Sequence, residues 1–234
     1  MVVTATNTSI LERPTYGISE AAKHLGIRRD RIRAWLDGYM RRGRVYPPVI
    51  RPQATGEEIV TWGEFVELGY LREYRRKGVS LQYLRPVIDE LRNVFELPYP
   101  LATKNLYLNG HEVVWKLQVQ NNLPSALAMV VRSGQMMMLA HEANSFFNKV
   151  EFDPNGGALG EARCIYPGGI DAYVRIDPLV CFGRPAIGGV ATERLWELRA
   201  AGEEVSEIAA DYEMPDHLVR TGVAFEEMQR VLAA

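Results

Sequence analysis

Residues 16–36, which read YGISEAAKHLGIRRDRIRAWL, decide the fold of the amino-terminal part of this chain. Ser19 is a favourable N-cap for a first helix that places Ala21 and Leu25 on one face. Gly26 supplies a tight turn, and a second helix follows. The apolar stripe of that second helix recurs at helical spacing: Ile32, Trp35 and Leu36. Two short amphipathic helices joined by a glycine turn predict a helix-turn-helix.

The solvent side of the second predicted helix is basic. Arg29 and Arg33 point away from the apolar stripe, and Arg31 flanks it. Guanidinium groups on such a face reach phosphates and base edges in the major groove of DNA. The alternative is a solvated basic helix, but spacing, turn and charge together favour DNA binding. The predicted DNA-contact residues are Arg28, Arg29, Arg31, Arg33, Arg41, Arg42, Arg44 and Arg51.

Charge is distributed unevenly along the 234 residues, whose net charge is −2. Residues 13–51 hold ten Lys/Arg against three Asp/Glu, whereas residues 172–234 hold six against eleven. A basic segment releases counterions from phosphates, and an acidic segment is repelled by them. The two ends are therefore expected to meet different partners, with duplex DNA at the amino-terminal end.

Two short runs follow the second helix, residues 45–51 and 58–61, and the turn between them predicts a wing. Helices are then expected at 62–77 and from Ser80 towards Phe95. The stretches 16–27, 31–35 and 71–81 resemble the MerR family of regulators. This resemblance covers roughly residues 14–92. It implies a recognition helix in the major groove, with Arg33 on the DNA backbone.

The segment departs from the MerR pattern in two places. Ile59 and Val60 occupy the region where that family usually places a wing arginine. Pro86 lies inside the last predicted helix, where proline costs about 3 kcal/mol or introduces a kink. The long helix through which MerR proteins dimerise is therefore not expected here. Dimerisation is assigned to residues beyond 97.

The middle of the chain, residues 98–171, is interpreted as a small α+β module. Asn109-Gly110 between two apolar runs predicts a hairpin. A helix is expected at 141–150 with Phe146 and Phe147 buried, and a strand at 162–166. The run Met136-Met137-Met138 is interpreted as core packing rather than a ligand pocket or metal site. No metal-ligand spacing is formed by His111, His141 and Glu142.

The carboxy-terminal part begins with RIDPLVCFGRPAIGGVAT, residues 175–192, and resembles a short helical family with no assigned enzymatic function. It departs from that family's pattern at Gly189-Val190, where a Thr-Arg pair is usual. Three helices are predicted, at 192–201, 206–212 and 216–232, the last two capped by Ser206 and Asp216. Their apolar residues exceed what three short helices can bury, which predicts a protein partner or a self-dimer. These residues are Leu195, Trp196, Leu198, Val205, Ile208 and Ala209.

Together the two ends resemble the VapB antitoxins of VapBC-type toxin–antitoxin pairs. The resemblance implies a homodimeric repressor of its own operon that also binds and silences a PIN-domain ribonuclease toxin. PIN nucleases hold divalent metal ions with clustered carboxylates, so an antitoxin arginine can act as a plug. The candidate partner-binding residues are Leu195, Trp196, Arg220 and Arg230.

Enzyme activity, a cofactor and a metal site are not expected. Four histidines are scattered, Cys164 and Cys181 are far apart, and no phosphate loop or paired-carboxylate motif is present. No apolar run is long enough to span a membrane, and residues 1–9 lack the layout of a signal peptide, so a cytoplasmic protein is expected. The alternative function is a MerR-like, ligand-responsive regulator with residues 98–171 as its sensor.

The expected fold class is α+β, mostly α. A polar tail at 1–13 precedes a winged helix-turn-helix at 14–97. The central α+β module at 98–171 then leads to a helical dimerisation and partner-binding domain at 172–234.

Overall fold

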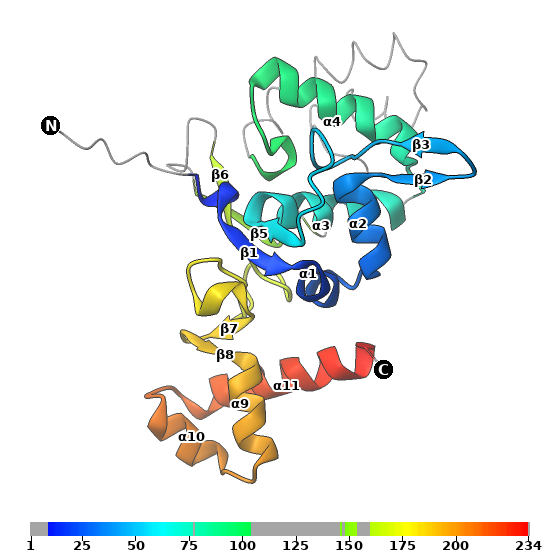
Figure 1. The fold of residues 1–234 in the computed structure, drawn as a ribbon. Helices are drawn as coiled ribbons and strands as arrows, with labels where there is room; N and C mark the ends of the chain where they lie inside the picture. The colour runs from blue at the N-terminus through cyan, green and yellow to red at the C-terminus, as the bar shows by residue number, and fades with distance from the viewer. Residues whose placement is uncertain (1–8, 77, 104–145, 147, 154–159, 234) are drawn as a thin grey trace, which may run out of the picture. The chain divides into compact units, whose positions relative to one another are not determined.

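The computed structural model describes residues 9–76, 78–103, 146, 148–153 and 160–233, which Figure 1 draws in colour. They combine helices with two-stranded sheets, as expected for the α+β class. The chain divides into two compact units, residues 1–147 with 152–162, and residues 148–151 with 163–234. This division does not follow the expected boundaries at 97 and 171. The reason is that Phe146 and Ala162 pack against helix residues of the first unit.

The first unit opens with a 3₁₀ turn and a short strand, which two short helices follow. Its elements up to the first long helix are η1 (Ile10–Glu12), β1 (Pro14–Gly17), α1 (Ile18–Leu25), α2 (Arg29–Asp37), β2 (Tyr39–Arg41), β3 (Arg44–Tyr46) and β4 (Ile59–Thr61). Gly26 ends α1 in the left-handed region (φ 58°) and donates its N–H to carbonyls of the last turn. The N-cap of α1 is Gly17, so the prediction of a Ser19 cap is wrong by two residues.

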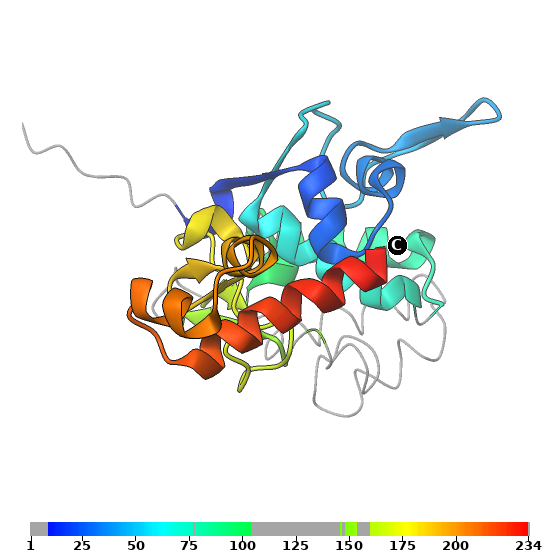
Figure 2. The same ribbon diagram turned by 90° about the horizontal axis from the view of Figure 1, so that it is seen from below.

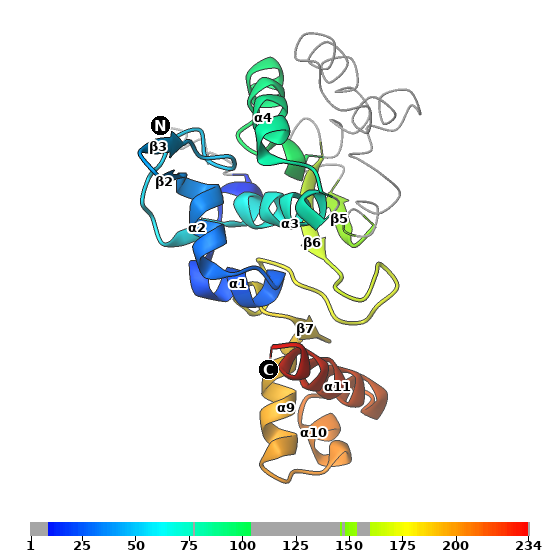
Figure 3. The same cartoon turned by 90° about the vertical axis from the view of Figure 1, so that its right-hand side faces the viewer.

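Helix α3 (Trp62–Arg76) is the core of the first unit, and Figure 3 shows α4 (Leu81–Phe95) and α1 on opposite sides of it. It is buried around most of its circumference, including the face with Phe65, Leu68, Leu71 and Tyr74. Two contacts bring later residues to it. The Trp62 indole donates to the Ala162 carbonyl at 2.7 Å. A Cβ on Gly69 would lie 2.1 Å from the Phe146 ring.

The wing lies elsewhere than predicted. The runs 45–51 and 58–61 do not pair with each other in the structure. Strand β3 pairs with β2, with Arg41 opposite Arg44, around a two-residue turn at Arg42-Gly43. Strand β4 pairs with β1, with Gly17 opposite Ile59. The turn residues have positive φ (50° and 75°), which matches the twist that two-residue hairpins require.

Helix α4 continues through Pro86 and ends at Phe95. Its buried face consists of Leu84, Val87, Ile88 and Leu91. Two arginines on it donate to the backbone that follows β3: Arg85 to the Pro48 carbonyl at 3.0 Å and Arg92 to the Ile50 carbonyl at 2.7 Å. The helix therefore braces the β3–β4 connection. Helix α4 is thus a short helix that packs within its own unit, and η2 (Pro100–Ala102) follows it.

The second unit is a small assembly of three helices that follows short strands in the chain. Its elements, with the strands at its edge, are β5 (Val150–Asp153), β6 (Glu161–Ile165), η3 (Cys181–Gly183), β7 (Ala186–Ile187), β8 (Val190–Ala191), α9 (Thr192–Ala200), α10 (Val205–Asp211) and α11 (Asp216–Ala233). The core cluster is Val174, Ile187, Leu195, Leu198, Ile208, Ala209, Met214 and Val219. Helices α9 and α11 approach closely at Gly222, where a Cβ would lie 2.8 Å from a methyl of Leu195.

Helix α10, strand β6 and Phe146 also had sequence-based expectations. Helix α10 begins one residue earlier than predicted, and its cap is Glu204, which forms a reciprocal capping box with Glu207 in place of the expected Ser206 cap. Strand β6 and buried Phe146 agree with the predictions for those residues. The expected 105–117 hairpin, the methionine run at 136–138, and the side chains of His111, His141, Glu142 and Phe147 lie outside the described residues.

No helix among the described residues is long and apolar enough to cross a membrane. Within the same residues, His, Cys, Asp and Glu side chains do not gather in a group of three that could hold a metal ion. The thiols of Cys164 and Cys181 are both free.

Glu67 on α3 is fully buried and is expected to make stability depend on pH. One carboxylate oxygen accepts the Leu101 N–H at 2.9 Å, and the other has no hydrogen-bond partner among the described residues. Burial raises the pKa of Glu67 from 4.5 to about 8, although nearby Arg92 opposes the rise. Between these two values the unfolded chain releases a proton that the folded chain keeps.

Stability should therefore be highest below pH 4.5 as far as Glu67 is concerned, and should fall as pH rises towards 8. Glu67→Gln keeps an acceptor for Leu101 and cannot ionise. We expect it to remove at least about 1–2 kcal/mol of the pH-dependent loss, since one pKa unit corresponds to about 1.4 kcal/mol. Urea unfolding of both proteins from pH 5 to pH 8.5 measures this; parallel pH profiles would contradict it.

Candidate nucleic-acid interface

Helix α2 presents a basic face to solvent, as its spacing predicts. Ile32, Trp35 and Leu36 are buried, with relative exposures of 0%, 3% and 0%. The side chains of Arg29, Arg31 and Arg33 are exposed, and Ala34 is half-buried between them. The segregation follows from the helical period, because residues three and four apart share one face.

The β2–β3 hairpin extends away from the helices of the first unit, and Figure 2 shows it as the light-blue ribbon reaching outward. Strand alternation puts Tyr39, Arg41, Arg44 and Tyr46 on one face. The two tyrosine rings stack at 4.6 Å with an interplanar angle of 6°. The guanidinium of Arg44 lies 5.5 Å from the centroid of the Tyr46 ring. This face therefore combines cations with flat aromatic surfaces.

The opposite face of the hairpin is apolar and open to solvent. Met40 is 73% exposed and Val45, its cross-strand partner, is 67% exposed. Most of their apolar surface stays in water, so burial of these two side chains contributes little to holding the hairpin in place. At its base the backbone strands approach closely, since a Cβ on Gly38 would lie 2.4 Å from the Tyr46 carbonyl oxygen, so a glycine is required at this position.

The exposed arginines differ in their partners. Arg28 donates to Asp30 at 3.1 Å, and both Arg33 and Arg29 contact Glu58, at 2.6 Å and 3.5 Å. Within the part of the chain that the structure describes, no acidic side chain pairs with Arg31, Arg41 or Arg42. These three therefore carry positive charge that no described acidic side chain compensates.

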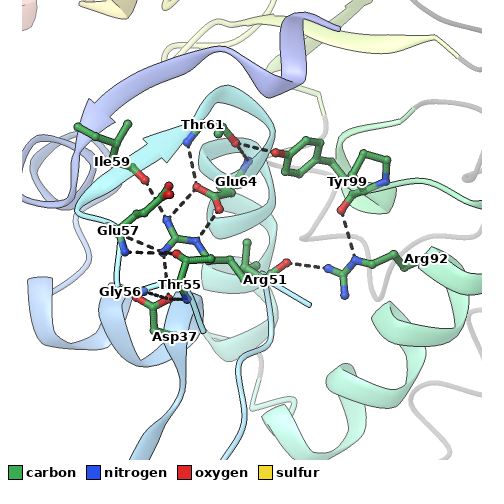
Figure 4. A network of polar contacts seen from close by, with 12 residues as sticks. Asp37, Arg51, Thr55, Gly56, Glu57, Ile59, Thr61, Glu64, Arg92 and Tyr99 are labelled. Carbon is green, nitrogen blue, oxygen red and sulfur yellow. Dashed lines mark hydrogen bonds and ion pairs between the residues drawn. The ribbon is translucent and has the colours of Figure 1, made fainter. Parts of the chain in front are cut away.

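Arg51 does not belong to this surface, and its assignment as a DNA contact is corrected. Its side chain is 5% exposed. Figure 4 shows it directed inward, between Asp37 at the end of α2 and Glu64 at the start of α3. It donates to Glu64 at 2.7 Å and to Asp37 at 2.9 Å. A guanidinium with these partners cannot also reach a phosphate.

The same arginine satisfies three further acceptors of the connection before β4. It donates to the Thr55 hydroxyl at 2.7 Å and to the carbonyls of Glu57 and Ile59 at 3.2 Å and 2.9 Å. Burial would raise the pKa of Asp37, but N–H donors from Thr55 and Gly56 and the Arg51 guanidinium hold it below its usual value. Arg51 therefore fixes the β3–β4 connection beside α2 through its hydrogen bonds to both.

In the second unit most of the predicted partner-binding residues make contacts within the unit itself. Leu195 is fully buried in the core, so its assignment as a partner contact is wrong. The guanidinium of Arg230 lies over the Trp196 ring at 3.6 Å and is 4.0 Å from Glu193. Arg220 is more accessible, with a side-chain exposure of 66% beside Asp216.

The prediction that the carboxy-terminal helices carry more apolar side chains than they can bury is also wrong for most of these side chains. Leu195, Leu198, Ile208 and Ala209 lie in the core cluster, and Val205 packs against it. Val174 and Ile187, which precede the helices, contribute the additional core surface that the sequence interpretation did not count.

The exposed apolar residues of this unit differ from the predicted partner-binding residues, and they lie in the loop before β7 and on α11. Phe182 is 84% exposed and Leu179 is 60% exposed, in the loop before β7. Cys181 and Phe182 both have positive φ (48° and 56°), a conformation that is unfavourable for side chains of this size. On α11, Met228 and Val231 are 56% and 76% exposed. The glycines around the loop were the only sequence signal of its unusual backbone.

The comparisons with known proteins cover most of the chain. The family described as "Protein of unknown function (DUF433)" matches residues 174–225. "Uncharacterized protein Rv2308" of Mycobacterium tuberculosis (strain ATCC 25618 / H37Rv) is 30% identical over 230 residues, which cover 96% of this chain and 94% of that protein. "Putative antitoxin VapB45" of the same strain is 30% identical over 229 residues, covering 88% and 91%.

The fold is also similar to a solved structure. The X-ray crystal structure of Rv2018 from Mycobacterium tuberculosis superposes with a TM-score of 0.68 at 26% sequence identity. The match covers 90% of this chain and 97% of that one. The similarity therefore extends over both units rather than a shared fragment.

Proposed function

Because this chain belongs to the family that includes Rv2308 and the putative antitoxin VapB45 of Mycobacterium tuberculosis, we propose that it is the antitoxin of a toxin–antitoxin pair. The observation that carries the proposal is the 30% identity to a protein with that name, over 91% of its length. We further propose that it neutralises a PIN-domain ribonuclease and represses its own operon by binding DNA as a homodimer.

The DNA-binding part of the proposal is supported by the first unit. Helices α1 and α2 with the β2–β3 hairpin are interpreted as a winged helix-turn-helix. Helix α2 would lie in the major groove, because its exposed face carries the arginines and its small Ala34 permits close approach. The hairpin would follow the sugar–phosphate backbone with Arg41, Arg42 and Arg44. Three of the exposed cations are without an acidic partner among the described residues, which leaves them available to phosphates.

The toxin-binding part is supported by the charge and surface of the second unit. Its eleven acidic residues in 172–234 repel phosphates and so favour a protein partner over DNA. Phe182 is the most exposed large apolar side chain of the described residues. Aromatic side chains held outward on a constrained backbone are favourable anchors for a protein interface. Arg220 is the exposed candidate for approaching the metal-binding carboxylates of a PIN domain.

The proposal predicts that a PIN-domain protein is encoded beside this chain's gene, and the direct test is to purify that protein and measure its ribonuclease activity with and without the full chain. We expect a stable complex on size exclusion and loss of ribonuclease activity. Phe182→Asn should weaken the complex at least about tenfold, or roughly 1.4 kcal/mol, because asparagine tolerates the same backbone while removing the ring.

Ile170→Asn is the matched control, since Ile170 is 50% exposed in the same unit. It should bind the toxin as the unaltered chain does. Undiminished ribonuclease activity at micromolar concentrations of the full chain, with no co-elution, would contradict the antitoxin proposal.

A further inference from the structure

Glu58 binds the two outer arginines of the proposed recognition helix. One of its carboxylate oxygens accepts from Arg33 Nη2 at 2.6 Å and from Nε at 3.0 Å, and the other accepts from Nη2 at 2.8 Å. Arg29 lies 3.5 Å from the same carboxylate. A fork of this kind is how a guanidinium binds phosphate oxygens as well as carboxylates. Glu58 thus occupies the binding position at Arg33 that a DNA phosphate would take.

Backbone hydrogen bonds fix the main chain at Glu58, and this places its carboxylate beside α2. Its carbonyl accepts the Ile18 N–H at the start of α1 at 3.0 Å. The next residue, Ile59, begins β4 and pairs with Gly17 of β1. On the other side, the Glu57 carbonyl accepts from buried Arg51. The acidic group is therefore built into the same framework that positions the recognition helix.

The ion pair is charged at neutral pH and open to exchange. The hydrogen bond from Arg33, with the charges of Arg33 and Arg29, holds the pKa of Glu58 below its usual value. The side chains of Arg33 and Glu58 are 44% and 56% exposed. Solvent-exposed ion pairs contribute little net stability, so a stronger competitor can replace the carboxylate without disturbing the fold.

We propose that Glu58 is an internal competitor for phosphate that sets the DNA affinity of this protein. In the free protein it holds Arg33 and partly neutralises Arg29. A DNA phosphate must displace this carboxylate from Arg33 before Arg33 can contribute to binding. The displaced carboxylate then stays near the DNA backbone and repels it. The result is a lower affinity for every duplex, which limits retention on non-specific DNA. This inference rests on the proposed DNA binding of the first unit.

Glu58→Gln is the informative substitution, because glutamine is nearly the same shape and can still accept from Arg33 but carries no charge. We expect it to bind a random-sequence duplex about 5- to 10-fold more tightly than the unaltered chain. The dependence of log affinity on log salt should steepen by about one phosphate contact, or roughly 0.9 in slope. Fluorescence anisotropy with a labelled duplex of about 30 base pairs, long enough for two half-sites, measures both.

Glu57→Gln is the matched control: it removes the same charge one residue away, from an exposed side chain that contacts neither arginine. Its gain in affinity should stay below about twofold, as expected for an exposed charge without a partner. In a double-mutant cycle, Glu58→Gln combined with Arg33→Ala should lose most of the gain, because the competition acts through Arg33.

Equal gains for the two glutamine variants, or a full gain without Arg33, would overturn the role of Glu58 while leaving DNA binding intact. Absence of binding by the unaltered chain and by every variant would instead overturn the DNA-binding proposal on which it rests.

Discussion

Replacing Arg51 by methionine is expected to destabilise the first unit by about 3–5 kcal/mol, because removal of one partner leaves a buried charge uncompensated. Asp37 and Glu64, its two acidic partners, have side-chain exposures of only 19% and 8%. Both carboxylates would remain in place with fewer donors. The Thr55 hydroxyl and two backbone carbonyls would also lose the donor they share.

Arg51→Lys separates charge from geometry. Lysine keeps the positive charge but offers three donors from one nitrogen, whereas Arg51 reaches acceptors on opposite sides. We expect an intermediate loss of about 2–3 kcal/mol. Arg44→Met, at an exposed hairpin position, is the control and should leave stability within about 0.5 kcal/mol. Chemical denaturation measures all three; unchanged stability of the Arg51→Met protein would contradict the structural role of Arg51.

The second large effect is expected on DNA affinity. Alanine at Arg31, Arg41 and Arg42 together should weaken binding to any duplex by at least about 100-fold, because three lost contacts at roughly 1 kcal/mol or more each sum to about 3 kcal/mol. The variant should fold normally, since no acidic partner is left unpaired among the described residues. Its salt dependence should become shallower, as fewer counterions are released.

The control for this variant carries the same change in net charge outside the interface. It replaces Arg75, Arg163 and Arg194, which are exposed and lie outside α2 and the hairpin. We expect a loss of less than about threefold from the reduced long-range field alone. Equal losses in the two triple variants would mean that net charge, rather than the α2 and hairpin surface, determines DNA affinity.

The helices were predictable from sequence because their signals are local. The stripe of Ile32, Trp35 and Leu36 and the glycine at position 26 determine α2 and its entry with no information from elsewhere in the chain. Strand pairing was not predictable in the same way. The run at 58–61 pairs with β1, more than forty positions earlier, and strands of three residues carry almost no alternation to indicate a partner.

The candidate site was predictable in its residue types but not in their environments. Arg51 belongs to the same basic segment as Arg41 and Arg42, yet it is buried because Asp37 and Glu64 converge on it from two helices. Leu195 was interpreted as surplus surface because Val174 and Ile187 were not recognised as its core partners. The role of Glu58 follows only from the fold, since it is 25 residues away from Arg33 in the chain.

The most direct test of the account is a comparison of two duplexes: the DNA upstream of this chain's own gene, and a scrambled duplex of the same length and composition. Both are titrated with the full chain at physiological salt. We expect the upstream duplex to be bound at least about 1,000-fold more tightly, as specific DNA-binding proteins bind their sites. Equal affinity for the two duplexes, or no binding to either, would contradict the proposal that this protein represses its operon through α2 and the β2–β3 hairpin.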